Sequence, residues 1–239
     1  MATGILYLIP TTLGESPLSL VIPEQVQKIA AGLTVFVAEN PKTARQYLKQ
    51  LELATPLQEI EMFTLDKHTK PEQLAQFLQP ALAGKDIGLV SEAGCPAVAD
   101  PGALLVRLAH ERGVRVVPLV GPSSILLALM ASGMNGQAFA FHGYLPIQKV
   151  ERGKKIAGLE KESMFRDQTQ IFIETPYRNQ SLLEDIIQAC EPDTELCIAT
   201  DITLVSERIE TRNIAEWRRK LPDINKKPTI FLLYRPRSG

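Results

Sequence analysis

Residues 89–102 have the sequence LVSEAGCPAVADPG, which is the most informative part of the chain for predicting the architecture. A short apolar run ends in Ser91, Glu92 and Gly94, and Asp100 then leads into an apolar, helix-like run from Gly102. This order predicts a strand that opens at its carboxyl end into a long, stiff loop of small residues. Because Gly and Pro fix the loop backbone and keep side chains away, the loop suits a small molecule lying against the main chain. A rigid connection without a ligand is the alternative.

A second loop of this kind follows the next expected strand. The chain continues as Val120-Gly121-Pro122-Ser123-Ser124, and an apolar helix runs from Ile125 to Ala131. Gly121 allows a tight turn, and Pro122 suits a first helical turn. The two serines place hydroxyls and unpaired N–H groups at a helix N-terminus, which favours a carboxylate or phosphate, although simple capping has the same pattern. Two such loops after neighbouring strands are stronger evidence for a ligand than either one alone.

Strand-like and helix-like segments alternate along the chain and predict an α/β fold. Strands are expected at 4–9, 33–38, 57–63, 86–91, 114–119, 138–143, 169–174, 194–200, 206–211 and 228–234. Helices are expected at 23–31, 41–52, 71–83, 102–112, 122–132, 151–163, 178–190 and 213–220. The expected architecture is two consecutive α/β domains, 1–119 and 120–239, each with a five-stranded, mostly parallel or mixed sheet. A ligand cleft would lie between them. A single larger sheet is the alternative.

The motifs resemble a known family. Residues 91–102 look like the signature loop of the tetrapyrrole methylases, the class III S-adenosylmethionine-dependent methyltransferases, where the pattern is Ser-Asp-Ala-Gly-Thr-Pro and then Asp-Pro-Gly. The closest branch is that of the small-subunit ribosomal RNA (cytidine-2'-O)-methyltransferases. Further matches, in the same order and spacing, are at 4–11, 38–39, 113–123, 131–133, 141–146 and 173–178.

The resemblance implies S-adenosylmethionine as the methyl donor and a site for it. The residues expected to cradle the donor are Pro10, Ser91, Glu92, Ala93, Gly94, Val98, Asp100, Gly121, Ser123, Ser124, Gly143 and Tyr144. Glu39, Glu174 and Arg178 are expected to face the acceptor, as tentative catalytic residues. A ribose hydroxyl is a poor nucleophile and gains from a nearby base, but no single base is assigned, since each acid could instead be a loop cap. Glu174 and Arg178 also fit a structural ion pair.

A basic cluster follows the Leu-Pro of the 141–146 motif. Lys149, Arg152, Lys154 and Lys155 are expected to meet RNA phosphates, and a solvated surface is the alternative. The polar stretch 149–168 is expected to be mobile and to become ordered on binding. Ribosomal RNA or the small ribosomal subunit is therefore the expected partner.

Departures from the family pattern keep other acceptors open. The branch has Glu-Asp-Thr-Arg where this chain has Glu39-Asn40-Pro41-Lys42, and Lys-Gly-Glu where this chain has Lys227-Pro228-Thr229. The alternatives are methylation of a tetrapyrrole or another small molecule, and a module that binds the donor without turnover. A dinucleotide-dependent oxidoreductase is disfavoured, because no G-x-G-x-x-G follows the first strand.

Composition limits the class of protein. The chain has 239 residues, 45% of them apolar and 22% charged, and a net charge of −1, so it lacks the overall basicity of many nucleic-acid binders. The three cysteines form no C-x-x-C pair, and their odd number fits reduced thiols. No signal peptide is evident, and no apolar run is long enough to span a bilayer. A cytoplasmic location is therefore expected. The histidines are scattered, and no metal site is expected. A homodimer is implied by the resemblance alone.

Overall fold

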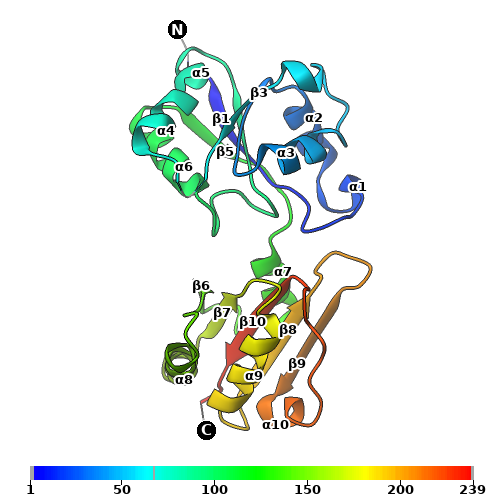
Figure 1. Cartoon of the computed structure of the whole chain (residues 1–239), viewed down its shortest axis with the longest axis vertical. Coiled ribbons are helices and arrows are strands. Elements are labelled where there is room, and N and C mark those ends of the chain that lie inside the picture. The colour runs from blue at the N-terminus through cyan, green and yellow to red at the C-terminus, as the bar shows by residue number, and fades with distance from the viewer. Residues whose placement is uncertain (1–2, 67, 238–239) are drawn as a thin grey trace. The chain divides into compact units, whose positions relative to one another are not determined.

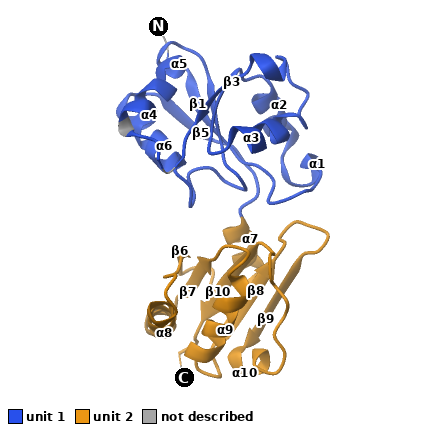
Figure 2. Ribbon diagram, viewed as in Figure 1, with its two compact units in different colours: residues 1–123 blue, residues 124–239 orange. Residues whose placement is uncertain are grey.

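The structure is a computed structural model that describes residues 3–66 and 68–237. It contains two compact units, Met1–Ser123 and Ser124–Gly239, which are blue and orange in Figure 2. The division expected after residue 119 falls in the segment that joins the last strand of the first unit to the first helix of the second. The α/β prediction with two five-stranded sheets is confirmed.

The first unit is built on a parallel sheet with the strand order β3-β2-β4-β1-β5. Its strands are β1 (Ile5–Ile9), β2 (Val35–Ala38), β3 (Glu61–Thr64), β4 (Ile87–Val90) and β5 (Arg115–Pro118). Its helices are α1 (Leu18–Val21), α2 (Glu24–Ala31), α3 (Pro41–Leu48), the 3-10 helix η1 (Leu57–Glu59), α4 (Pro71–Phe77), α5 (Gln79–Leu82) and α6 (Gly102–Glu111).

Both faces of this sheet are covered, as Figure 1 shows, with α1–α3 on one side and α4–α6 on the other. Alternation along β2 produces the two layers: Val35 and Val37 pack into the cluster under α4–α6, while Phe36 packs into the cluster under α1–α3. The central strands β2 and β4 are buried along their whole length, as expected for a parallel sheet with helices on both faces.

The strand order creates a site at the carboxyl edge of this sheet. β1 and β4 are neighbours, but the chain leaves β1 toward β2 and leaves β4 toward β5, in opposite directions. The loops that follow these two strands therefore diverge. In open α/β sheets the crevice at such a switch point is the usual place for a ligand.

The second unit has a mixed sheet with the order β6-β7-β10-β8-β9, in which only β6 and β7 are parallel. Its elements are α7 (Ser124–Ser132), β6 (Phe139–Tyr144), α8 (Lys149–Arg166), β7 (Thr169–Ile173), α9 (Asn179–Ala189), β8 (Glu195–Thr200), β9 (Arg208–Asn213), α10 (Ile214–Trp217) and β10 (Thr229–Tyr234). Residues of α8, α9 and α10 pack with Phe172 and Phe231 of the sheet into one core, and α7 contacts β9 and β10.

The local structure differs from the expectations in several places. The helix expected at 151–163 is confirmed and is longer, because residues 149–166 of the stretch expected to become ordered only on binding already form the continuous helix α8. Arg152, Ile156, Leu159 and Ser163 recur at helical spacing and are all buried, so this face of α8 is fixed against the core. The short helix α1 had no counterpart among the predicted elements. Residues 57–59, expected as the start of a strand, form the 3-10 helix η1, and the strand β3 begins at Glu61.

No helix within residues 3–66 and 68–237 combines the length and the apolar character needed to cross a membrane.

Candidate functional site

The loop after β4 is tied to the loop after β1 through Gly94. The Gly94 carbonyl accepts hydrogen bonds from the Thr11 N–H (3.0 Å) and from the Ser91 hydroxyl (2.7 Å). Gly94 has φ +72°, a conformation that a side chain would strain, and a Cβ there would lie 3.1 Å from Leu13 Cδ2. The loops after β1 and β4 continue in opposite directions, but the hydrogen bond from Thr11 joins them at Gly94 and fixes their positions relative to each other.

Asp100 is a structural residue of the same loop. Its Oδ1 accepts hydrogen bonds from the N–H groups of Ala97 (2.9 Å) and Gly102 (2.7 Å). Ala97 and Ala99 have φ values of +64° and +60°, which are costly for an L-residue. Burial raises the pKa of Asp100, and the two N–H donors oppose that shift. The carboxylate thus holds the strained turn before α6.

The loop after β5 lies against the same region. An added Cβ on Gly121 would be 2.2 Å from Cγ and 2.5 Å from Cβ of Pro10, so only glycine allows this contact. The Pro122 carbonyl accepts a hydrogen bond from the Cys95 thiol (3.4 Å). Within the first unit, the structure thus brings together Pro10, Gly94 and Gly121 from the predicted donor set, while Val98 is half exposed farther along the loop.

A groove of about 510 Å³ opens beside these loops. Three segments line it, the loop after β1, helix α3 with the turn that ends it, and the start of the loop after β4. The lining residues are Thr11, Thr12, Leu13, Gly14, Glu15, Ser16, Thr43, Gln46, Tyr47, Gln50, Ser91, Glu92 and Ala93. Of the predicted site residues, only Ser91, Glu92 and Ala93 belong to this wall.

Hydrogen bonds fix two walls of the groove to each other. Thr43 Oγ1 donates to Glu92 Oε1 at 2.6 Å, which joins α3 to the loop after β4. The Tyr47 hydroxyl donates to the Pro10 carbonyl at 3.3 Å. Burial raises the pKa of Tyr47 to about 12, so its phenol keeps the donated proton at neutral pH.

The contribution of α3 was missed from the sequence. Thr43, Gln46, Tyr47 and Gln50 are spaced by three, one and three residues and therefore share one helical face. Three of them are polar, so this face of the helix produces no hydrophobic pattern in the sequence. Glu39, the expected acceptor residue on this side, is exposed directly after β2 and does not line the groove.

The second unit gathers other predicted residues at one edge of its sheet. Tyr144 on β6 pairs with Ile173 on β7, so Gly143 and Tyr144 lie next to the start of the 174–178 turn. Gly143 has φ +63° at an irregularity in β6, and Tyr144 is 57% exposed. Ser124 is the first residue of α7.

Glu174 and Arg178 form the ion pair considered from the sequence. Glu174 Oε1 accepts from Arg178 Nη2 and from the Thr175 N–H, both at 2.6 Å. The Glu174 side chain is fully buried, and that of Arg178 is 38% exposed. Glu174 Oε2 and Arg178 Nε are buried without a hydrogen-bond partner. Glu174 is therefore placed to orient the guanidinium, and Arg178 is the member of the pair that solvent reaches.

The basic cluster divides into two groups. Lys149, Lys154 and Lys155 are exposed on α8. Arg152 is buried, and its guanidinium bonds to Asp185 at 2.5 Å, as well as to the Ile147 carbonyl. The inclusion of Arg152 among the RNA-binding residues is therefore corrected: at helical spacing it faces the core, and its charge is already paired.

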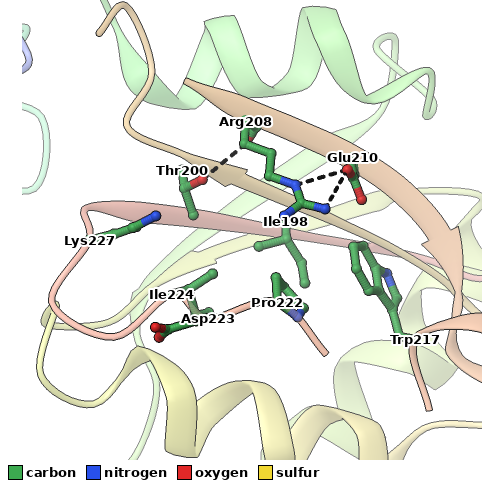
Figure 3. Close-up of a pocket in the computed structure, with 9 residues that line it drawn as sticks. All are labelled: Ile198, Thr200, Arg208, Glu210, Trp217, Pro222, Asp223, Ile224 and Lys227. Atoms are coloured by element: carbon green, nitrogen blue, oxygen red, sulfur yellow. Dashed lines mark hydrogen bonds and ion pairs between the residues drawn. The ribbon is translucent and has the colours of Figure 1, made fainter. Parts of the chain in front are cut away.

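A second cavity, near β8 and β9, is too small for a substrate. Figure 3 shows Arg208 bonded to Glu210 (2.7 and 2.9 Å) and Thr200 bonded to the Arg208 carbonyl at its wall. Its volume is about 30 Å³, enough for an ordered water and little more. Among the described residues, no group of three or more His, Cys, Asp or Glu side chains could hold a metal ion.

Solved structures share this fold. The methyltransferase CobJ has a TM-score of 0.64 at 18% identity, with 99% of this chain and 98% of that one covered. A uroporphyrin-III C-methyltransferase from Thermus thermophilus, complexed with S-adenosyl homocysteine, has a TM-score of 0.59 at 15% identity, with 97% and 98% covered. At these identities the likeness establishes the fold alone.

Some curated proteins are more similar to this chain in sequence than these solved structures are. The "Ribosomal RNA small subunit methyltransferase I" of Vibrio cholerae is 31% identical over 232 residues, covering 96% of this chain and 76% of the relative. The protein of the same name from Bacillus subtilis is 32% identical over 214 residues, covering 89% and 68%. The family model for tetrapyrrole (corrin/porphyrin) methylases matches residues 22–217. The chain therefore belongs to the tetrapyrrole methylase family of S-adenosylmethionine-dependent methyltransferases.

Proposed function

We propose that this chain transfers a methyl group from S-adenosylmethionine to a ribose 2'-hydroxyl in small-subunit ribosomal RNA. The observation that carries the proposal is the similarity to relatives named as small-subunit ribosomal RNA methyltransferases, 31% identical over 96% of this chain in the Vibrio cholerae case. The 2'-oxygen as target comes from the resemblance of the motifs to that branch. A cytoplasmic location follows from such a substrate, and a homodimer from the same resemblance.

The groove supports RNA over a tetrapyrrole as the acceptor. Uroporphyrin-type tetrapyrroles carry many carboxylate side chains, and a site for them needs cationic partners. The described residues that line the groove include Glu15 and Glu92 but no Lys, Arg or His. A polycarboxylate would meet like charge there, whereas a neutral, hydrogen-bonding nucleoside would not.

The loops around Gly94 and Gly121 fit a flat donor molecule. A Cβ at Gly121 would fill space that Pro10 already occupies, and one at Gly94 would lie 3.1 Å from Leu13 and 3.2 Å from the Pro122 carbonyl, so the absence of side chains at both positions lets these loops pack closely. In this proposal Ser91–Gly94, Gly121 and Ser123 of the first unit bind the donor. That Ser124, Gly143 and Tyr144 of the second unit also bind it stays a prediction. Val98 and Asp100 belong to the same set, with Asp100 acting through the loop that it holds.

Bound S-adenosylmethionine supplies an electrophilic methyl group, and its transfer to the ribose oxygen leaves S-adenosylhomocysteine and releases the hydroxyl proton. The protein's part is to bring donor and acceptor to near-attack distance. That Glu39, Glu174 and Arg178 face the acceptor stays a prediction, and Glu39 lies outside the groove described above. Glu174 acts as a positioning residue, because it is buried and holds the exposed edge of Arg178 ready for a phosphate.

The first test is the transfer of labelled methyl from S-adenosylmethionine to small ribosomal subunits, and to their naked RNA, from cells lacking this protein. We expect label in a 2'-O-methyl nucleotide after complete digestion. Donor binding is measured by calorimetry on the same preparation. Donor binding without label in RNA would contradict the proposed acceptor, and label in a base rather than a ribose would contradict the 2'-oxygen.

The exposed lysines of α8 give a second test. Replacing both Lys154 and Lys155 with Glu is expected to weaken RNA binding for all sequences, with donor affinity unchanged. The slope of log affinity against log salt should fall by about two, one for each lost phosphate contact. The control is Lys28→Glu with Lys85→Glu, which changes the net charge equally at exposed positions of the first unit. Equal RNA affinities for the two double variants would show that Lys154 and Lys155 do not contact RNA and are only part of a solvated surface.

A further inference from the structure

We propose that the groove between α3 and the loops after β1 and β4 binds the acceptor nucleoside itself, and that Gln46 and Gln50 recognise its base. The proposal rests on the proposed function, because it takes RNA as the acceptor. It adds to that function a site for the target nucleotide and two residues that would determine which base is accepted.

The size and chemistry of the groove suit a nucleoside. Its volume of about 510 Å³ lies within the range of about 300–1,000 Å³ typical of small-molecule sites. Most of its lining residues carry a hydroxyl, an amide or a carboxylate, and none of the described ones carries a cationic group. Base edges and ribose hydroxyls are neutral donors and acceptors, and they match such a wall better than a phosphate would.

Gln46 and Gln50 have the freedom to contact a base. Both side chains are exposed at the groove, and the structure gives neither amide a hydrogen bond to any described residue. Each carboxamide carries an acceptor and two donors, which is the arrangement that reads a base edge in pairs of hydrogen bonds. Gln46 lies on α3, and Gln50 lies one turn further along, so both reach the same side of the groove.

The wall behind these amides is preformed. The Thr43–Glu92 and Tyr47–Pro10 hydrogen bonds fix α3 to both loops, so a ligand does not have to order the site. Ser16 also lines the groove, and its Oγ is buried without a hydrogen-bond partner. Ser91–Ala93 borders the groove and also belongs to the proposed donor site. An acceptor in the groove would therefore meet the donor at this segment.

The test combines direct binding with turnover. The four ribonucleosides are titrated at millimolar concentration into the full chain saturated with S-adenosylhomocysteine, and amide chemical shifts are followed by NMR. Methyl transfer to small-subunit RNA is measured in parallel. In the wild type we expect one nucleoside to bind more tightly than the others, with shifts in the three groove segments. The double variant Gln46→Ala and Gln50→Ala should lose about tenfold or more in affinity and in kcat/KM for RNA.

Gln76→Ala is the matched control, because Gln76 is also an exposed glutamine on a helix of the first unit and lies outside the groove. It should bind and react as the wild type does. The proposal is overturned if no nucleoside binds, if the double variant binds and reacts normally, or if the double variant loses affinity for S-adenosylhomocysteine instead. Nucleoside binding lost in the double variant, with no methylation of RNA by the wild type, would reject the proposed function and keep the groove as a nucleoside site.

Discussion

Gly121→Ala is expected to lower the affinity for S-adenosylmethionine by about 5- to 150-fold, the equivalent of the ~1–3 kcal/mol that overpacking typically costs. The added Cβ would lie 2.2 Å from Cγ of Pro10, whose ring cannot rotate away as a flexible side chain would. The loops after β5 and β1 must then separate, and both belong to the proposed donor site. Titration calorimetry with S-adenosylhomocysteine measures the loss.

The control for this variant is Gly32→Ala at the end of α2. An added Cβ there would meet its nearest atoms at 3.6 and 3.7 Å, an ordinary contact, and Gly32 has no positive φ. Both variants should remain folded at 25 °C, since 1 kcal/mol shifts Tm by only about 2–4 °C in a protein of this size. A Gly121→Ala protein that binds the donor as tightly as Gly32→Ala would show that the donor does not lie on these loops.

Asp185→Ala is expected to destabilise the protein by about 3–5 kcal/mol, because it leaves the buried Arg152 guanidinium without its anionic partner. The side chains of Arg152 and Asp185 are 6% and 5% exposed and lie 2.5 Å apart. Lys149, at 3.7 Å from Asp185, would lose a partner as well. Urea unfolding followed by circular dichroism gives the change in the free energy of unfolding, if the transition remains two-state.

Two comparison variants distinguish the effect of burying an unpaired charge on stability from the effect of losing an ion pair. Glu111→Ala breaks an ion pair with Arg107 on the surface of α6, where both side chains are more than half exposed, and should cost at most about 1 kcal/mol. Replacing Arg152 with Met and Asp185 with Leu together should recover most of the stability lost in Asp185→Ala, because no buried charge remains unpaired. If Asp185→Ala costs no more than Glu111→Ala, Arg152 is free to reach solvent and returns to the candidates for RNA binding.

The sequence was most informative where backbone conformation limits the choice of residue. Gly94 and Gly121 could be identified as loop glycines because glycine is needed for a positive φ, as at Gly94, or for a close approach, as at Gly121. Most of the strands could be located because they are short apolar runs bounded by turn residues, whereas β9, with the sequence RIETRN, contains a single apolar residue.

What could not be predicted depends on which way a side chain points. Arg152 and Lys154 are two residues apart and equally basic, but on a helix that spacing places them on different faces, one in the core and one in solvent. The groove requires residues 11–16, 43–50 and 91–93 to be neighbours, and only the strand order brings them together. Hydrophobic patterning does not predict which of these segments are neighbours, because the residues that line the groove are mostly polar.

Helix α3 divides its residues between two kinds of selection. Ala44, Tyr47 and Leu48 are buried and hold the helix on the sheet, whereas Thr43, Gln46 and Gln50 turn toward the groove. Neighbouring positions thus contribute either to folding or to substrate choice, except that Thr43 and Tyr47 contribute to both, because each lines the groove and fixes α3 to a loop. Related enzymes can therefore diverge in specificity at Gln46 and Gln50 while the buried residues keep the fold intact, and a library that varies only these two glutamines would sample new acceptors on an unchanged scaffold.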